Sequence, residues 1–143
     1  MSKIQIIENI LNANDQIAQE NQQVLRQHCI YSVNVMASPG AGKTSFILRT
    51  IQGLSKSIRK AVIEGDTAPV TIDADKVQSS GIPVVQINTG GECHLDANMV
   101  KSALSQLPLD QLDLVIVENV GNLICPAAFK LGTALNLVIA SLP

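Results

Sequence analysis

Residues 31–44 read Tyr-Ser-Val-Asn-Val-Met-Ala-Ser-Pro-Gly-Ala-Gly-Lys-Thr, and this stretch decides the fold. Its first six residues, a run rich in β-branched side chains, predict a short strand. The residues from about 43 to 54 predict a helix. Between the two, residues 37–44 match the phosphate-binding pattern G-x-x-x-x-G-K-[ST] except at the first position, where Ala37 replaces glycine. The order of strand, small-residue loop and helix therefore indicates a phosphate-binding loop.

The residue types of this loop suit the phosphates of a nucleotide. Small residues allow successive backbone N–H groups to curl around a polyphosphate, and the helix N-terminus adds the positive end of its dipole. Lys43 can reach the β- and γ-phosphates, and the Thr44 hydroxyl can join the ligands of Mg²⁺. The expected nucleotide-binding residues of the loop are Gly40, Ala41, Gly42, Lys43, Thr44 and Ser45. Two other interpretations are a plain glycine-rich turn and a dinucleotide-binding turn, which would want glycine or alanine where Ser45 stands.

Two acidic residues follow strands whose ends should lie beside this loop. Asp66 comes just after the apolar run 60–64, and Glu118 ends the run 112–118, three residues before Gly121. We expect the two carboxylates to hold Mg²⁺ or its water, and the Gly121 amide to sense the γ-phosphate. The simpler alternative is an acidic residue that caps a strand and a glycine that makes a turn.

Strands and helices alternate along the rest of the chain. Strands are expected at 60–64, 82–87, 112–118 and 135–140, and helices at 71–80, with Asp73 and Asp75 in its first turn, and at 95–107. Because most of the strands are apolar on both faces, they indicate a buried parallel sheet. We predict an α/β fold with a mostly parallel sheet and helices on both faces, of the phosphate-loop NTPase type.

An amphipathic helix is expected at residues 3–28, before the first strand. Its apolar stripe repeats every seven residues, but asparagine interrupts one row of it at Asn14 and Asn21. This interruption favours docking onto the domain over a coiled coil. We therefore divide the chain into a docked helix, residues 1–30, and a nucleotide-binding domain, residues 31–143.

Cys93 and His94 come just after the third predicted strand, and Cys125 comes just after the fourth. The carboxyl ends of parallel strands share an edge with the phosphate loop, so these side chains should meet there. Two thiolates and an imidazole suit Zn²⁺, Ni²⁺ or Cu, with further ligands from solvent, substrate or a second subunit. The alternative is ordinary packing of two cysteines and a histidine. For His28-Cys29 we expect a histidine at a helix end followed by a buried cysteine.

Composition excludes several classes of protein. The net charge of −2 and an aromatic content of 2% argue against a nucleic-acid-binding surface. No apolar run approaches the ~18 residues that a membrane span needs, and the N-terminus turns polar too early for a signal peptide. Three cysteines among 143 residues fit a reducing compartment better than a disulfide framework. We expect a cytoplasmic protein without membrane or nucleic-acid partners.

Four blocks of this sequence resemble the HypB family of hydrogenase nickel-incorporation GTPases, which belong to the SIMIBI class of phosphate-loop NTPases. The blocks are Asn34–Thr44, Val62–Asp66, Gln86–Ala97 and Val117–Pro126. The resemblance extends over almost the whole chain. The Cys-His-Leu-Asp and Glu-Asn-Val-Gly-Asn motifs in this order carry most of its specificity.

The resemblance implies a function and a set of roles. It implies a GTPase that binds GTP or GDP with Mg²⁺ and inserts nickel into a hydrogenase precursor, with a GTP-dependent homodimer and a HypA-type nickel chaperone as partners. Lys43, Asp66 and Glu118 would be catalytic, and Thr44 would bind Mg²⁺ together with the two carboxylates. Cys93, His94 and Cys125 would bind Ni²⁺ or Zn²⁺.

The sequence also departs from the family pattern. It lacks the N-terminal tract rich in cysteine or histidine that some members carry, and Ala128 and Lys130 replace expected acidic residues. The Asn-Lys-x-Asp segment that reads guanine is absent, so we expect a chain truncated at its C-terminus. Two further readings stay open: a hydrolysis-deficient remnant that binds metal or a partner, and a phosphate-loop ATPase.

Overall fold

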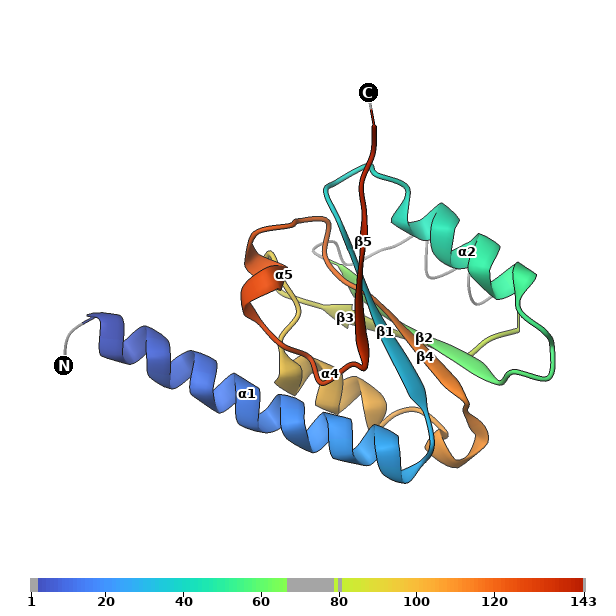
Figure 1. Cartoon of the computed structure of the whole chain (residues 1–143), viewed down its shortest axis with the longest axis horizontal. Helices are drawn as coiled ribbons and strands as arrows, with labels where there is room; N and C mark the ends of the chain where they lie inside the picture. Colours follow the sequence, from blue (N-terminus) through green and yellow to red (C-terminus); the bar gives the residue numbers. More distant parts are fainter. Residues whose placement is uncertain (1–2, 67–78, 80, 143) are drawn as a thin grey trace.

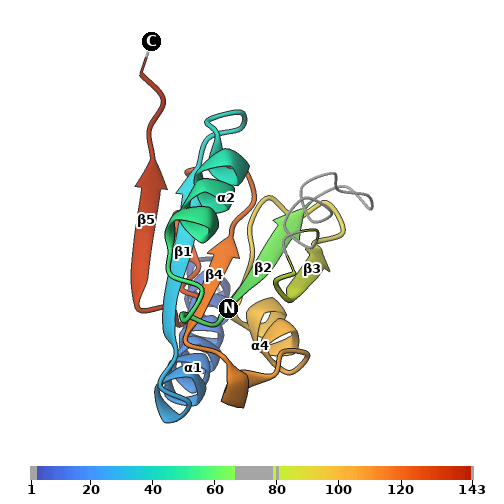
Figure 2. The same ribbon diagram turned by 90° about the vertical axis from the view of Figure 1, so that its right-hand side faces the viewer.

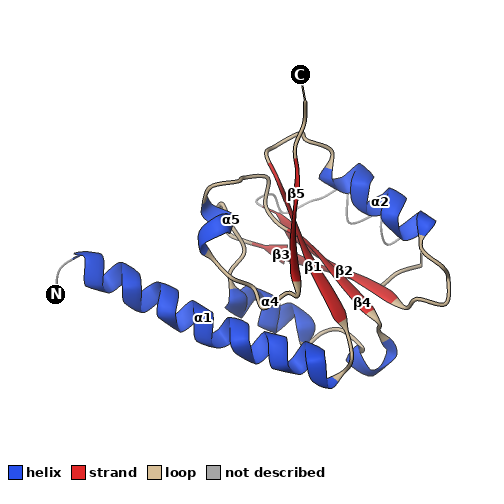
Figure 3. Cartoon of the chain, viewed as in Figure 1, coloured by secondary structure: helices blue, strands red, loops and turns tan. Residues whose placement is uncertain are grey.

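The computed structural model describes residues 3–66, 79 and 81–142, with residues 3–9 and 66 described through their backbone alone. In the described part of the chain, helices separate most of the consecutive strands (Figures 1 and 3). The elements are α1 (Lys3–Gln27), β1 (Tyr31–Ala37), α2 (Lys43–Gly53), β2 (Lys60–Asp66), β3 (Val84–Asn88), α4 (Ala97–Leu104), η1 (Leu109–Gln111), β4 (Leu114–Glu118), α5 (Cys125–Ala128) and β5 (Leu135–Ile139). The expected helix 71–80, with Asp73 and Asp75, lies outside the described residues apart from residue 79.

The five strands form one parallel sheet in the order β3-β2-β4-β1-β5, which confirms the predicted fold class. The central strands β1 and β4 pair from Tyr31 opposite Leu114 to Val35 opposite Glu118. β2 pairs with the other side of β4, and Glu64 lies opposite Glu118. Because all of these strands point the same way, the loops after β1, β3 and β4 emerge at one edge of the sheet, where β2 also ends (Figure 2).

Successive strand residues point to opposite faces of the sheet, and helices cover both faces of the central strands β2, β4 and β1. Ile63 and Val117 belong to a core shared with Leu25 of α1 and with Val100 of α4. On the other face, Val62, Val35 and Ile116 pack with Ile47 and Ile51 of α2. Burial on both faces is the reason that these central strands are largely apolar without alternation, whereas the edge strands β3 and β5 stay partly exposed.

The long helix α1 lies along α4 on one side of the sheet (Figure 1). Two asparagines on it are buried. Asn14 accepts a hydrogen bond from the Ala97 N–H at 2.8 Å, and Asn21 donates to the Ala97 and Leu131 carbonyls at 2.8 and 3.0 Å. They therefore tie α1 to the start of α4 and to the loop before β5. No helix in the described part of the chain has the length and apolarity that a bilayer crossing demands.

Some element boundaries differ from the sequence-based ones. α4 starts at Ala97 rather than at 95, because the Asp96 side chain accepts a hydrogen bond from the Met99 N–H at 2.8 Å and caps the helix. The short helix α5 was not predicted. Its four residues, with a proline in the first turn, are too few to show a helical period.

The expectation of a buried cysteine after α1 was wrong. Cys29 is exposed and takes a positive φ of 55°. It ends the helix in the left-handed conformation, a position that glycine usually occupies. The His28 ring lies 2.8 Å from the Val24 carbonyl oxygen and 3.4 Å from an Asp110 carboxylate oxygen, which makes it a helix-end residue as expected.

An ion pair joins Arg59, which precedes β2, to Asp113, which precedes β4, and it leads to a prediction about stability and pH. Asp113 accepts two hydrogen bonds from the Arg59 guanidinium, at 3.0 and 3.1 Å, and one from its backbone N–H at 2.9 Å. These bonds lower the pKa of Asp113 from 3.8 to about 2. The contribution to stability is therefore present above the ordinary pKa and is lost as the pH falls toward about 2.

We expect Asp113→Asn to lower the urea midpoint of unfolding near neutral pH. Because both groups of the pair are exposed, the effect is expected to be small. The curves of wild type and variant should converge between about pH 4 and pH 2. Asp110→Asn is the control for loss of a carboxylate, since that side chain is 95% exposed and has one longer contact, at 3.4 Å, with the His28 ring. A constant gap across this pH range would contradict the assignment.

Candidate functional site

A cavity of about 440 Å³ opens at the edge of the sheet where the strands end. Its wall combines the phosphate loop, the end of β2 and the loops after β3 and β4. The lining residues are Pro39, Lys43, Glu64, Gly65, Gly91, Cys93, Glu118, Asn119, Val120, Gly121 and Asn122. Residues far apart in the sequence thus converge where a parallel sheet ordinarily binds its ligand.

The phosphate loop has the backbone conformation that its glycines permit. Gly40 and Gly42 have φ of 75° and 93°, values that other residues rarely adopt. Ala37, by contrast, is the last residue of β1 and is fully buried, and its φ is not positive. The first position of the loop therefore does not need the conformational freedom of glycine here.

Lys43 and Gly121 face each other across the loop. A Cβ on Gly121 would lie 3.3 Å from the Lys43 Nζ and 3.2 Å from the Pro39 Cα. Any side chain at position 121 would therefore crowd the phosphate loop. The close approach places the backbone of the 119–122 loop next to the ammonium group that would bind a terminal phosphate.

Thr44 and Glu118 form the oxygen-rich end of the site. The Thr44 hydroxyl donates to Glu118 Oε1 at 3.0 Å, and the Glu118 side chain is buried. A hydroxyl next to a carboxylate is a donor set that suits Mg²⁺, a cation that prefers oxygen ligands. The residues present therefore fit this ion.

Glu64 is a site residue that the sequence-based reasoning missed. It is 2% exposed, lines the cavity and lies opposite Glu118 in the register of β2 and β4. Two buried carboxyl groups on adjacent strands repel each other when both are ionised, and Lys43 or a divalent cation would relieve that repulsion. An acidic residue inside a predicted strand was the available signal.

The structure places the other predicted nucleotide residues as follows. Asp66 is the last residue of β2, in register with Asn88, and its side chain is outside the described atoms. Ala41 donates its N–H to the Ser38 carbonyl at 3.2 Å. Ser45 is exposed in the first turn of α2. Residues 40–45 thus form the end of the phosphate loop and the first turn of α2.

Cys93, His94 and Cys125 form one group. Their potential ligand atoms all lie within 4.8 Å of one another, and all three side chains are half-buried. Zn–S bonds of about 2.3 Å put tetrahedral ligands roughly 3.8 Å apart, so a small closure would accommodate an ion. Two sulfurs and one imidazole suit Zn²⁺ or Ni²⁺.

Contacts with nearby side chains hold the His94 ring in place and change the pKa of Cys93. The His94 ring stacks on Phe129, with a centroid separation of 3.9 Å and an interplanar angle of 13°. The Cys125 thiol forms a hydrogen bond that raises the pKa of Cys93, and burial raises it further. Binding of a metal ion here would displace the proton of Cys93, so the affinity would rise with pH.

Asn122 connects the two loops that carry the cysteines. Its side-chain amide donates to the Cys93 carbonyl at 3.4 Å, and its Oδ1 accepts from the Ile124 N–H at 2.8 Å. Cys93 also lines the cavity that contains Lys43. The Cys93-His94-Cys125 group and the phosphate loop therefore border the same cavity.

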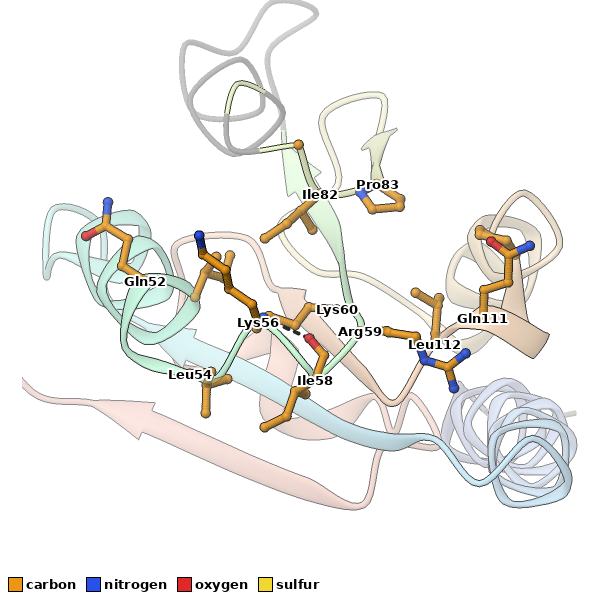
Figure 4. Close-up of a pocket in the computed structure, with 13 residues that line it drawn as sticks. Gln52, Leu54, Lys56, Ile58, Arg59, Lys60, Ile82, Pro83, Gln111 and Leu112 are labelled. Carbon is orange, nitrogen blue, oxygen red and sulfur yellow. Dashed lines mark hydrogen bonds between the residues drawn. The ribbon is translucent and has the colours of Figure 1, made fainter.

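A larger cavity, of about 830 Å³, lies at the opposite end of the strands (Figure 4). Its floor is mainly apolar, and most of its basic side chains already have hydrogen-bond or ion-pair partners. Arg59 pairs with Asp113, and Lys60 donates to the Ser55 and Ile58 carbonyls at 3.1 and 2.8 Å. It holds no cluster of catalytic or metal-binding groups among the residues that are described, so the smaller cavity is the candidate site.

Comparisons with known proteins show which family and fold the chain resembles. Residues 31–139 match the family described as "CobW/HypB/UreG, nucleotide-binding domain". The chain is 46% identical over 138 residues to "Hydrogenase maturation factor HypB" of Azotobacter vinelandii, a match that covers 96% of this chain and 45% of that protein. It is 40% identical over 133 residues to the protein of the same name from Escherichia coli K12, with 93% and 46% covered.

Two solved structures are similar as well. The crystal structure of HypB from Helicobacter pylori in complex with nickel aligns with a TM-score of 0.81 and 38% identity, over 88% of this chain and 59% of that one. HypB from Archaeoglobus fulgidus gives the same TM-score and identity, over 90% and 62%. The chain spans about half the length of these curated relatives.

Proposed function

The chain belongs to the CobW/HypB/UreG family of nucleotide-binding domains, and from that premise we propose that it is a GTP-dependent metallochaperone domain that supplies nickel for hydrogenase maturation. The relatives named for hydrogenase maturation and the related structure solved with nickel support this proposal. The substrate would be GTP and the cargo Ni²⁺.

One observation carries the proposal. Cys93 belongs to the Cys93-His94-Cys125 group and also lines the cavity that contains Lys43 and Gly121. If nucleotide turnover is to control metal release, the metal site and the phosphate site must lie next to each other, as they do in this cavity. A simple NTPase would need no thiols there.

The chain's own residues suggest how the nucleotide would be handled. The N–H groups of residues 40–45 and the Lys43 ammonium would bind the phosphates, and the Gly121 backbone would meet the γ-phosphate beside Lys43. Mg²⁺, when bound through Thr44 and Glu118, supplies positive charge to the phosphate oxygens. Asp66 and Glu118 are the carboxylates proposed to orient the attacking water. Loss of the γ-phosphate would remove the group that the Gly121 backbone meets, and so would release the 119–122 loop from that contact.

The metal group implies partners. Three ligands leave a four-coordinate shell incomplete, so a fourth would come from solvent or from a second copy of the chain. We propose a GTP-dependent homodimer at this edge. Transfer would then involve a HypA-type chaperone and the hydrogenase large-subunit precursor. A ligand set that can be opened in this way suits delivery better than storage.

The first test concerns the nucleotide. Purified protein is titrated with fluorescent GDP in Mg²⁺ buffer, and bound probe is displaced with unlabelled GDP, ADP or guanosine. We expect micromolar binding that GDP reverses and ADP does not. Equal displacement by ADP would contradict guanine selectivity and favour a domain that binds phosphates without reading the base. No binding at all would contradict the proposal.

A further inference from the structure

We propose that Asn119 is the positioning residue that links the nucleotide loop to the metal loop, so that a shift of one moves the other. The inference rests on the proposed function, because it concerns how the two sites communicate. Asn119 lies between Glu118, which ends β4, and Val120, and its side chain is 1% exposed.

One side-chain oxygen joins the two loops. Asn119 Oδ1 accepts hydrogen bonds from the Val120 N–H at 2.9 Å and from the Leu95 N–H at 3.2 Å. Val120 directly precedes Gly121, the residue that approaches Lys43. Leu95 directly follows the metal ligand His94. The oxygen therefore bridges the phosphate-sensing segment and the ligand-bearing segment.

The rest of the Asn119 side chain is held by β1. Its amide donates to Asn34 Oδ1 at 3.2 Å, and its backbone N–H donates to the Val35 carbonyl at 3.0 Å. Asn34 in turn donates to Asn136 of β5 at 3.2 Å. The Val120 and Leu95 N–H groups are both donors, so the Asn119 side-chain atom that faces them must be the acceptor oxygen. The side-chain nitrogen therefore points to Asn34.

Burial makes the bridge difficult to bypass. Leu95 has no exposed surface, so its N–H could not form a hydrogen bond with solvent water if Asn119 moved away. A displacement of residues 119–121 toward a bound γ-phosphate would therefore carry Leu95 with it. His94 and Cys93 lie next in the chain. The Asn122 bond to the Cys93 carbonyl, at 3.4 Å, is longer and lies nearer the surface.

The test compares nickel affinity in two nucleotide states. Nickel binding is measured by competition with a chromogenic chelator, in GDP and in a non-hydrolysable GTP analogue. For wild type we expect the two affinities to differ by ~5–150-fold, the usual range of coupling between two sites. In Asn119→Ala we expect this ratio to fall to within about twofold, with each nucleotide present at a concentration that saturates the variant.

Two further variants separate coupling from general damage. Asn119→Asp keeps oxygen acceptors for both N–H groups and should restore most of the ratio. Asn136→Ala removes the far contact with Asn34 and leaves the loop bridge intact, so the wild-type ratio is expected. A wild-type ratio in Asn119→Ala would overturn the inference and leave the proposed function standing. No nucleotide effect in wild type would overturn both.

A measurement on the unmodified chain covers the case in which Asn119→Ala does not fold. Amide hydrogen exchange is followed at Val120 and Leu95 in GDP and in the GTP analogue. We expect both amides to change protection together, because one oxygen holds them. A change at Val120 with none at Leu95 would overturn the inference.

Discussion

Lys43→Ala is expected to weaken the binding of GDP and GTP by ~10–100-fold, since a hydrogen bond to a charged group contributes about 1.5–3 kcal/mol. The Lys43 Nζ lies within 3.3 Å of a Cβ built on Gly121 and lines the candidate cavity. It is the cation best placed to meet β- and γ-phosphates there. Any hydrolysis should fall further, by ~10²–10³, because charge that develops on the phosphate loses its fixed donor. Fluorescent-GDP titration and phosphate release measure the two effects.

Lys56→Ala provides the matched control for this variant. Lys56 lines the cavity at the opposite end of the strands, so the same chemical change should leave nucleotide binding unaltered. Thermal melting of both variants shows whether the fold is kept. Unchanged GDP affinity in Lys43→Ala, with the fold intact, would show that the phosphates bind elsewhere.

Cys125→Ser is expected to lower the affinity for Ni²⁺ by more than ~100-fold, beyond the 10–100-fold that loss of a supporting contact typically causes. The cluster offers three ligand atoms within 4.8 Å, and a serine hydroxyl is a poor replacement for a thiolate. The thiolate-to-nickel charge-transfer absorption should weaken in parallel. Chelator competition and the ultraviolet spectrum measure the two effects independently.

Cys29→Ser is the control for the metal experiment. Cys29 is an exposed cysteine at the end of α1 and is not part of the cluster. Its removal should leave nickel affinity and the absorption band unchanged. If Cys29→Ser abolished the band and Cys125→Ser did not, the assigned ligand set would be wrong.

Much of the site followed from the order of motifs along the chain. The pattern around Lys43 fixed a loop between a strand and a helix, and parallel strands bring the loops after them to one edge. Cys93 and Cys125 were therefore expected to meet, and the structure places them in one group. Spacing sufficed because the topology of a parallel sheet leaves few arrangements for loops that follow successive strands.

Glu64 and the buried asparagines were not predicted to have these roles, for a physical reason. An acidic residue within an apolar run has no fixed partner until strand register is known, and it is the pairing of β2 with β4 that puts Glu64 opposite Glu118. Asn14 and Asn21 only indicated that α1 docks. Their actual partners, backbone groups of Ala97 and Leu131, are more than 70 residues away in the chain.

The sequence by itself determined the local elements of this protein: the strand–loop–helix with Lys43, the parallel α/β class and the three metal-binding candidates. These depend on periodicity and on residue chemistry over short stretches, which the chain carries locally. Only the tertiary structure decided that Asn119 bridges Val120 and Leu95, and that Cys93 shares a wall with Lys43. Such contacts depend on register and on the packing of distant segments, and these are fixed only when the whole sheet assembles.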